Sequence, residues 1–168
     1  ARHHMQQATA TARESLGQAR RVVQDLRPEV LEGIPLADAI RREGEKWSER
    51  TGVGVSVTVT GAALPLHPQC EVALLRAAQE CLANVHRHAG AGQVNVTLSY
   101  MPDRVLLDVQ DDGVGFANGK SVSADGPEGG FGLIAMRQRV EALGGSLLVE
   151  SSPGEGATVV VEIPRHGQ

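Results

Sequence analysis

Hydrophobic residues follow two periods along the chain, one typical of helices and one typical of strands. Apolar residues that recur every three or four positions predict helices over residues 5–26, 36–51, 69–88 and 131–143. Apolar residues that alternate with small or polar ones predict strands over residues 53–59, 94–100, 105–111, 147–150 and 157–163. Because short turns join most of these strands, the sequence predicts a two-layer α/β sandwich. Its mixed, mainly antiparallel sheet would be covered on one face.

A proline-containing linker separates the first predicted helix from the rest of the chain. That helix presents a narrow apolar seam from Met5 to Leu26, as helices of a bundle do, and Pro28 ends it. A seam with this much alanine is also compatible with a helix that packs along its own domain. We therefore predict an N-terminal helical segment over residues 1–27, a linker over 28–35 and a main domain over 36–168.

Composition argues against two classes of partner. Apolar residues make up 41% of the chain, and no apolar run approaches the roughly 20 residues of a membrane span, so neither a span nor a secretory signal is expected. A net charge of −4, with one Trp, one Tyr and two Phe, is a poor match to nucleic acid. Cys70 and Cys81 form no C-x-x-C pair, so we expect a reduced core thiol at Cys81 and a cytoplasmic protein.

The most informative segment is the turn D-D-G-V-G-F over residues 111–116, which follows directly on a predicted strand. A carboxylate at a buried strand end, here Asp111, supplies one hydrogen-bond acceptor, and Gly113 and Gly115 leave room for a planar ring beside it. Adenine, with its exocyclic amino group, is the best candidate. Aspartate and glycine at a strand end more often form only an ordinary turn, so this pattern needs support from other elements.

The predicted helix over residues 69–88 carries Glu80, Asn84 and His88 at i, i+4 spacing on one face. An asparagine carbonyl oxygen suits Mg²⁺, and Glu80 can hold a metal-bound water or accept a proton. His88 completes this candidate catalytic set, and with Arg87 it would lie near the phosphates. Such a triplet is more commonly just the solvated face of an amphipathic helix. Asparagine, however, is unfavourable inside helices, which hints at a ligand.

A glycine-rich segment opens the last predicted helix. Gly130 and Gly132 can leave backbone N–H groups free at a helix N-terminus, where they attract phosphate oxygens, although such glycines alone are weak evidence. The polar stretch before them, about residues 117–130, has too few apolar residues to pack. A lid that closes over a nucleotide is the functional interpretation, and a plain surface loop is the alternative.

Four segments, taken in order, resemble the sequence boxes of one known family. They cover residues 79–89, 111–116, 130–133 and 154–158, the last followed by Pro164. They resemble the asparagine box, the two glycine boxes and the closing strand of the ATP-binding (HATPase) domain of sensor histidine kinases, in the GHKL superfamily. Residues 19–28 and 132–140 resemble the NarL-type subgroup. The ordered occurrence of four elements is far more specific than any one of them.

The resemblance implies a Bergerat-type fold and a role for each matching residue. Asp111 would accept from the adenine amino group, Asn84 would bind Mg²⁺, and Glu80 would assist phosphoryl transfer or hold metal-bound water. Gly113 and Gly115 would let the backbone approach ATP. The other matching residues would border the phosphates, form the hinge of the lid or lie behind the adenine; they are Gly130, Gly132, Leu133 and Thr158.

Two departures from the family pattern affect these expectations. Ala157 stands where the family often has the first of two threonines, which leaves Thr158 as the remaining hydroxyl. The family's phosphoacceptor histidine is followed by an acidic residue, whereas His3 and His4 are followed by Met5 and Gln6, so neither matches. Residues 1–27 then resemble the second helix of the dimerisation and phosphoacceptor bundle. We expect this chain to bind ATP without autophosphorylating. The sequence leaves open whether His3 and His4 are native.

We therefore predict the catalytic ATP-binding domain of a two-component sensor histidine kinase, which donates the γ-phosphoryl of ATP to a histidine on its own bundle and serves a response regulator. A GHKL-type protein serine kinase, as in anti-sigma factors, and a non-catalytic nucleotide-binding scaffold are the alternatives. The parent kinase should be a homodimer. The sequence leaves open its signal, its response regulator, its membrane anchoring and the oligomeric state of this chain. His67 and His166 are interpreted as ordinary surface residues.

Overall fold

The computed structural model describes residues 31–116 and 130–165. The predicted N-terminal helix, the segment 1–27 and almost the whole predicted lid lie outside these ranges, as does the first part of the predicted linker. In chain order the elements are α2 (Leu36–Thr51), β1 (Gly54–Thr60), α3 (Pro68–Asn84), the π-helix η2 (Val85–Ala89), β2 (Gln93–Tyr100), β3 (Arg104–Asp111), α4 (Gly130–Ala142), β4 (Ser146–Ser151) and β5 (Ala157–Pro164).

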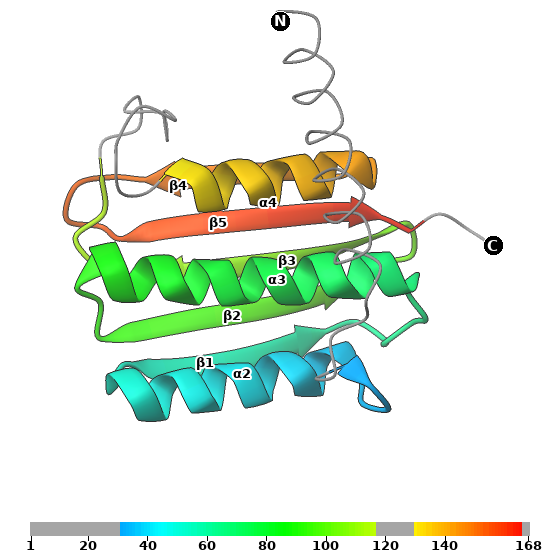
Figure 1. Ribbon diagram of the computed structural model, residues 1–168, viewed down its shortest axis with the longest axis horizontal. Helices are drawn as coiled ribbons and strands as arrows, with labels where there is room; N and C mark the ends of the chain where they lie inside the picture. Colours follow the sequence, from blue (N-terminus) through cyan, green and yellow to red (C-terminus); the bar gives the residue numbers. More distant parts are fainter. Residues whose placement is uncertain (1–30, 117–129, 166–168) are drawn as a thin grey trace, which may run out of the picture.

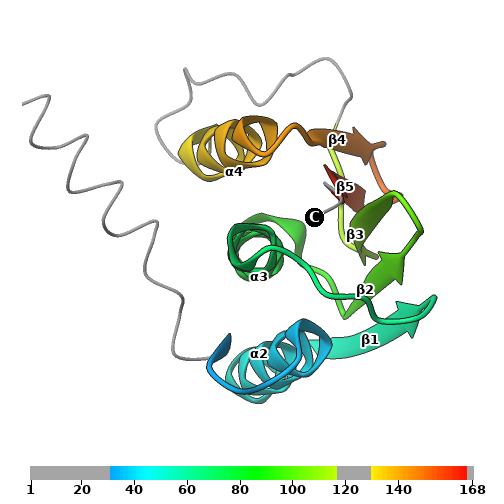
Figure 2. The same cartoon turned by 90° about the vertical axis from the view of Figure 1, so that its right-hand side faces the viewer.

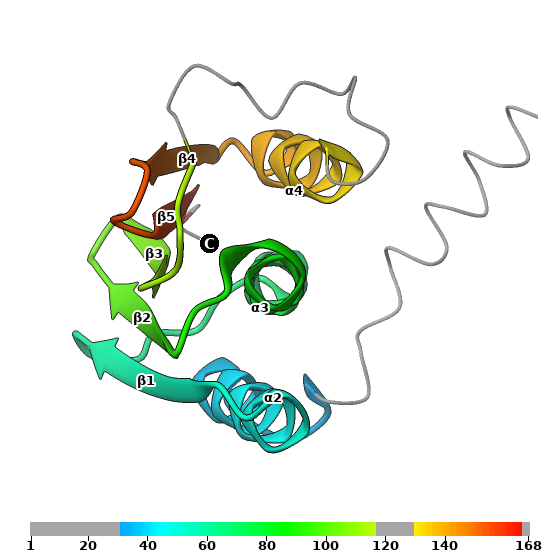
Figure 3. The same ribbon diagram turned by 90° about the vertical axis from the view of Figure 1, so that its left-hand side faces the viewer.

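The five strands form one sheet in the order β1-β2-β3-β5-β4 (Figure 1). β1 and β2 are parallel, and the other three pairings are antiparallel. Helices α2, α3 and α4 lie side by side on one face of this sheet, as the two end-on views show (Figures 2 and 3). The predicted two-layer α/β sandwich with a mixed, mainly antiparallel sheet is therefore confirmed. β5, the last strand of the chain, lies between β3 and β4.

The core fills the space between the helices and the sheet, and α2 shows how the sequence builds it. Its predicted apolar face is buried, with Leu36, Ala39, Ile40 and Trp47 each at most 5% exposed. Pro35 precedes the helix at the N-cap, and Gly52 ends it with φ 75°, donating its N–H to the Ser48 carbonyl oxygen at 2.8 Å. Alternate positions of each strand face the same core.

The opposite face of the sheet is polar on its β1–β2 side. The Ser56 hydroxyl donates to Asn95 Oδ1 at 2.7 Å, and the Thr60 and Ser99 hydroxyls are 2.8 Å apart. This alternation of apolar and polar faces is what a sheet covered by helices on one side requires. Within residues 31–116 and 130–165, no helix combines the length and the apolar composition that a membrane crossing requires.

The helix that carries the predicted catalytic face differs from expectation at its C-terminal end. Periodicity predicts one α-helix to residue 88, but α3 ends at Asn84 and continues as the π-helix η2, which Gly90 ends with φ 59°. A π-helix closes its hydrogen bonds over five residues, so its turn is wider than that of an α-helix. η2 also contains His86, whose ring forms a T-shaped pair with that of Trp47, with the two centroids 6.5 Å apart.

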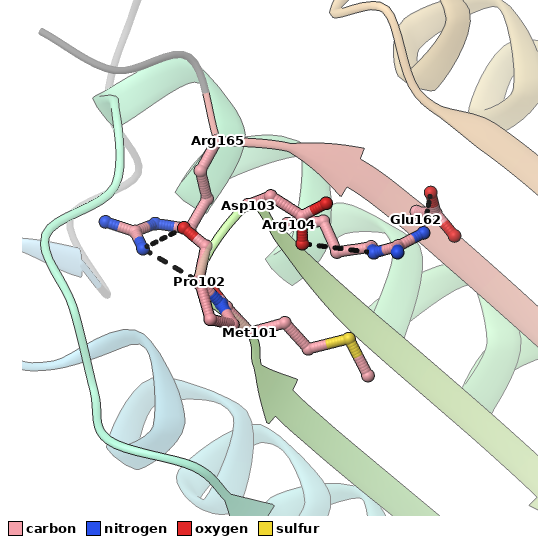
Figure 4. Close-up of polar contacts among 6 residues, drawn as sticks. All are labelled: Met101, Pro102, Asp103, Arg104, Glu162 and Arg165. Carbon is pink, nitrogen blue, oxygen red and sulfur yellow. Dashed lines mark hydrogen bonds and ion pairs between the residues drawn. The ribbon is translucent and has the colours of Figure 1, made fainter.

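The end of β5 is fixed to the β2–β3 hairpin at the end of the sheet opposite Asp111. The Arg165 guanidinium donates to the Pro102 carbonyl oxygen at 3.0 Å. The backbone N–H of Arg165 donates to the Asp103 carbonyl oxygen at 2.8 Å. Arg104 lies between Asp103 and Glu162 (Figure 4). These contacts hold the outer end of the sheet and leave the other end for the glycine turn.

Candidate functional site

A cavity of about 320 Å³ lies where α3, η2 and α4 meet the ends of β3 and β5. Its polar lining comes from Asn84, His88 and Asp111. The rest of its lining is apolar or small, from Cys81, Val85, Ala89, Val109, Gly115, Phe116, Leu133, Val149, Ala157 and Val159. A mostly apolar cavity with a few polar groups is typical of a small-molecule site. Apolar walls with few polar side chains suit a planar ring. The structure thus brings five sequence-predicted residues together: Asn84, His88, Asp111, Gly115 and Leu133.

Asp111 is the buried acceptor of the site, with 8% of its surface exposed. Its Oδ1 accepts the backbone N–H of Gly113 at 2.9 Å, the one hydrogen bond that the described residues donate to this carboxylate. The remaining acceptor capacity of Asp111 is available to the cavity that it lines. Gly113 itself packs so closely on the end of η2 that a side chain would overlap the Ala89 carbonyl oxygen. Glycine here lets the turn approach the helix.

Asp112, which the sequence analysis did not single out, fixes the turn to the sheet. Its Oδ1 accepts the backbone N–H groups of Gly92 and Gln93, each at 2.9 Å. These hydrogen bonds, first that of Gln93 and then that of Gly92, lower the pKa of the Asp112 carboxyl. The tendency of aspartate to accept hydrogen bonds from nearby backbone at turns was the available sequence signal.

The Asp112 contacts predict a pH-dependent contribution to stability. A carboxyl whose pKa is lower when folded stabilises the fold above its unfolded pKa of about 3.9, and that contribution is lost as the pH falls through the folded value. We expect Asp112→Ala to unfold at lower urea concentration than the unsubstituted chain at pH 7, with the gap closing towards pH 3. Asp112→Asn, which keeps an acceptor but does not titrate, should show a gap that varies less. Equal gaps for Asp112→Ala at both pH values would contradict this role.

Glu80 lies beside the cavity and not among its lining residues. Its carboxylate packs against the first turn of α4, where a side chain on Gly132 would overlap it. The same carboxylate is 3.4 Å from the Arg87 guanidinium, which also donates to the Ala83 carbonyl oxygen at 3.3 Å. A helix N-terminus stabilises a negative charge, so this position suits a carboxylate. Arg87 therefore reaches Glu80 and does not line the cavity.

Asn84 and His88 face the cavity from the end of α3 and from η2. The Asn84 carboxamide receives and donates no hydrogen bond among the described residues, so its oxygen is free for a ligand. Mg²⁺ usually takes one or two protein oxygens together with phosphate oxygens and water. The described residues contain no cluster of three or more His, Cys, Asp and Glu side chains able to hold a metal ion by themselves. The donor set thus fits a cation that arrives with a phosphorylated ligand.

The other predicted residues lie at or beyond the edge of the cavity. Gly130 is the first residue of α4 and directly follows residues 117–129, which lie outside the described ranges. Thr158 does not line the cavity, whereas its neighbours Ala157 and Val159 do, because successive side chains of a strand point to opposite faces.

Cys81 is buried as predicted, and it lines the cavity too. Burial, and then the charges of Glu80 and Asp111, raise the pKa of its thiol to about 12, so it stays neutral.

Comparison with known proteins identifies the family. The sequence profile of the histidine kinase-, DNA gyrase B- and HSP90-like ATPases matches residues 69–167. The chain is 31% identical over 152 residues to signal transduction histidine-protein kinase/phosphatase DegS of Brevibacillus brevis, covering 90% of this chain and 38% of DegS. It is 35% identical over 153 residues to sensor histidine kinase MctS of Rhizobium johnstonii, covering 90% of this chain and 32% of MctS. The chain thus spans about a third of the length of these curated relatives.

A solved structure agrees with the sequence relatives. The blue-light activated histidine kinase EL346 of Erythrobacter litoralis superposes with a TM-score of 0.62 at 28% identity, covering 79% of this chain and 42% of that chain. This chain therefore belongs to the histidine kinase-, DNA gyrase B- and HSP90-like ATPase family. It is the catalytic ATP-binding domain of a two-component sensor histidine kinase, and curated relatives such as DegS are NarL-type sensor kinases.

Proposed function

We propose that this domain binds ATP with Mg²⁺ and donates the γ-phosphoryl group to a histidine on the dimerisation and phosphoacceptor bundle of the same kinase. The observation that carries the proposal is the arrangement of two side chains around one cavity. Asp111 offers a buried acceptor on the sheet side, and Asn84 offers, on the helix side, a carboxamide that has no hydrogen-bond partner among the described residues. One nucleotide could contact both residues. Its adenine amino group would donate to Asp111, and its phosphates would lie towards Asn84.

In this proposal each residue acts by position and charge. Asp111 accepts from the adenine amino group, while the apolar walls exclude water from the faces of the ring. Asn84, and Glu80 through a water, would hold Mg²⁺, which neutralises charge on the phosphates when bound. His88 at the cavity wall and Arg87 beside Glu80 lie on the phosphate side. Phosphoryl transfer depends mainly on positioning and charge stabilisation, so these few groups suffice.

The same proposal sets the place of the domain in signalling. Its own bundle would present the phosphoacceptor histidine, and the phosphoryl group would pass from there to a response regulator. We propose a cytoplasmic location, since ATP and the response regulator of such a relay are intracellular. We also propose that the parent kinase is a homodimer. The named relatives support this interpretation over a serine kinase, because those quoted above are histidine kinases or sensor histidine kinases.

The test is transfer in trans. The chain is mixed with Mg²⁺, radiolabelled ATP and the separately expressed bundle of its parent kinase. We expect acid-labile phosphate on the bundle, no labelling when the bundle histidine is replaced by alanine, and none when EDTA removes the metal. Acid-stable phosphate would instead indicate a serine kinase. Tight ATP binding with no transfer to the bundle would favour a non-catalytic scaffold and overturn the proposed reaction.

A further inference from the structure

Two turns that are far apart in the sequence lie against each other beside the cavity. The glycine turn follows β3, and the β4–β5 turn, residues 152–156, precedes β5. Because Asp111 pairs with Ala157 in the antiparallel β3–β5 ladder, both turns leave the same end of the sheet. The Gly154 N–H donates to the Val114 carbonyl oxygen at 2.7 Å and joins them directly.

Ser151 provides a second link between these turns. It is the last residue of β4 and is only 6% exposed. Its hydroxyl oxygen accepts the Phe116 backbone N–H at 2.9 Å, and its hydroxyl proton is donated to the Gly156 carbonyl oxygen at 2.7 Å. One side chain thus satisfies a donor from the glycine turn and an acceptor from the β4–β5 turn. Only a hydroxyl can donate and accept in this way at such a small size.

The part of the glycine turn held by Ser151 is the part that forms the cavity wall. Gly115 and Phe116 both line the cavity. Gly115 has φ 60°, and a side chain there would overlap the Ser152 carbonyl oxygen, so the two backbones are in direct contact. The position of this wall relative to Asp111 therefore depends on how firmly the β4–β5 turn holds it.

We propose that Ser151 is a positioning residue of the nucleotide pocket, which keeps Gly115 and Phe116 at the distance from Asp111 that an adenine ring requires. This inference rests on the proposed ATP binding. Ser151 touches no ligand itself and acts through the Phe116 N–H. Without the hydroxyl, the Phe116 N–H and the Gly156 carbonyl lose this shared partner, and the wall is free to move away from Asp111.

The experiment compares Ser151→Ala, Ser151→Thr and Ser152→Ala by calorimetry with a non-hydrolysable ATP analogue and Mg²⁺. We expect Ser151→Ala to weaken binding by about tenfold or more, as the loss of buried hydrogen bonds does. Ser151→Thr keeps the hydroxyl and should remain within about threefold of the unsubstituted chain. Ser152→Ala changes an exposed neighbouring side chain and should bind normally.

Two further measurements separate positioning from general stability. Val105→Ala removes buried volume at the far end of β3, and we expect it to lower the unfolding temperature without changing affinity in the folded protein. Hydrogen exchange should show the Phe116 amide protected in nucleotide-free unsubstituted protein and unprotected in Ser151→Ala. The exchange of the unsubstituted protein also tests the link if Ser151→Ala fails to fold.

The outcomes are distinct. An unsubstituted chain that does not bind the analogue overturns the proposed ATP function. If that chain binds and Ser151→Ala binds equally well, or if the Phe116 amide exchanges freely in the unsubstituted chain, Ser151 is not a positioning residue. Equal losses of affinity in Ser151→Ala and Val105→Ala would reduce its role to general stability.

Discussion

Replacing Asp111 with asparagine should weaken ATP binding by about 100-fold, although the two side chains have nearly the same shape. Oδ1 of Asp111 accepts the Gly113 N–H at 2.9 Å, so the proposed adenine contact would use the other carboxylate oxygen. In the variant the amide oxygen would keep the Gly113 bond, and the NH₂ group would face the amino group of the ring. Two donors would then oppose each other. Hydrogen bonds to charged groups contribute about 1.5–3 kcal/mol, roughly 10- to 150-fold in affinity, and the donor clash favours the upper part of that range.

Isothermal titration with ATP and GTP analogues provides the measurement and its internal control. The new NH₂ group can donate to the O6 acceptor of guanine. The variant should therefore lose less affinity for the GTP analogue than for the ATP analogue, so its preference for ATP over GTP should fall. Asp112→Asn is the matched control, because it makes the same chemical change one residue later. The Asp112 carboxylate accepts backbone N–H groups, those of residues 92 and 93 among them, as an amide oxygen can. An ATP affinity in Asp111→Asn that equals that of Asp112→Asn would refute the adenine contact.

The sequence predicted the helix layer, the sheet type and several of the residues that line the cavity. Alternation and helical spacing are local signals, and each is strong where an element has one buried face. The glycine turn and the asparagine helix were recognised from such local patterns together with the family resemblance. The structure brings Asn84 and Asp111 to the same cavity from these two elements. That meeting was expected only from the resemblance.

The other side of the site depends on strand order, which local periodicity does not encode. β5 lies between β3 and β4, so Ala157 and Val159 reach the cavity beside Asp111. Thr158 was selected for its hydroxyl, but the alternation of side chains along a strand takes it out of the cavity lining. The residue at the family's first threonine position, Ala157, is the one that faces the cavity in this chain. Ser151 was also missed, because its contacts with the Phe116 and Gly156 backbones depend on how the strands are ordered and not on a local pattern.

The π-helix shows a different limit of sequence analysis. Residues 85–89 continue the helical apolar spacing of α3, with Val85 and Ala89 buried, so periodicity alone does not separate them from an α-helix. The wider turn matters because it carries Arg87 and His88 at the edge of the site. His88 lines the cavity, whereas the Arg87 side chain reaches back to Glu80.

Replacing Gly132 with alanine should slow phosphoryl transfer by about 100-fold while leaving the fold as stable as before or more stable. The backbone of Gly132 is helical, so alanine fits it and gains up to about 1 kcal/mol of helix propensity. The added methyl group, however, would overlap the Glu80 carboxylate and push it from its place at the start of α4. A shift of about 1 Å in a catalytic group can cost about 100-fold in rate. Transfer to the separate bundle, measured beside the unfolding temperature, tests this expectation.

A double-mutant cycle identifies the cause of the slower transfer. If the methyl group acts only by displacing Glu80, then Gly132→Ala should have little further effect in a chain that already carries Glu80→Ala, since no carboxylate remains to be displaced. Glu80→Ala alone should lower transfer at least as much as Gly132→Ala alone. Independent effects of the two substitutions would mean instead that Gly132 acts elsewhere, for example on the hinge that the family resemblance implies. The contact between one glycine and one carboxylate would then be a packing feature without catalytic consequence.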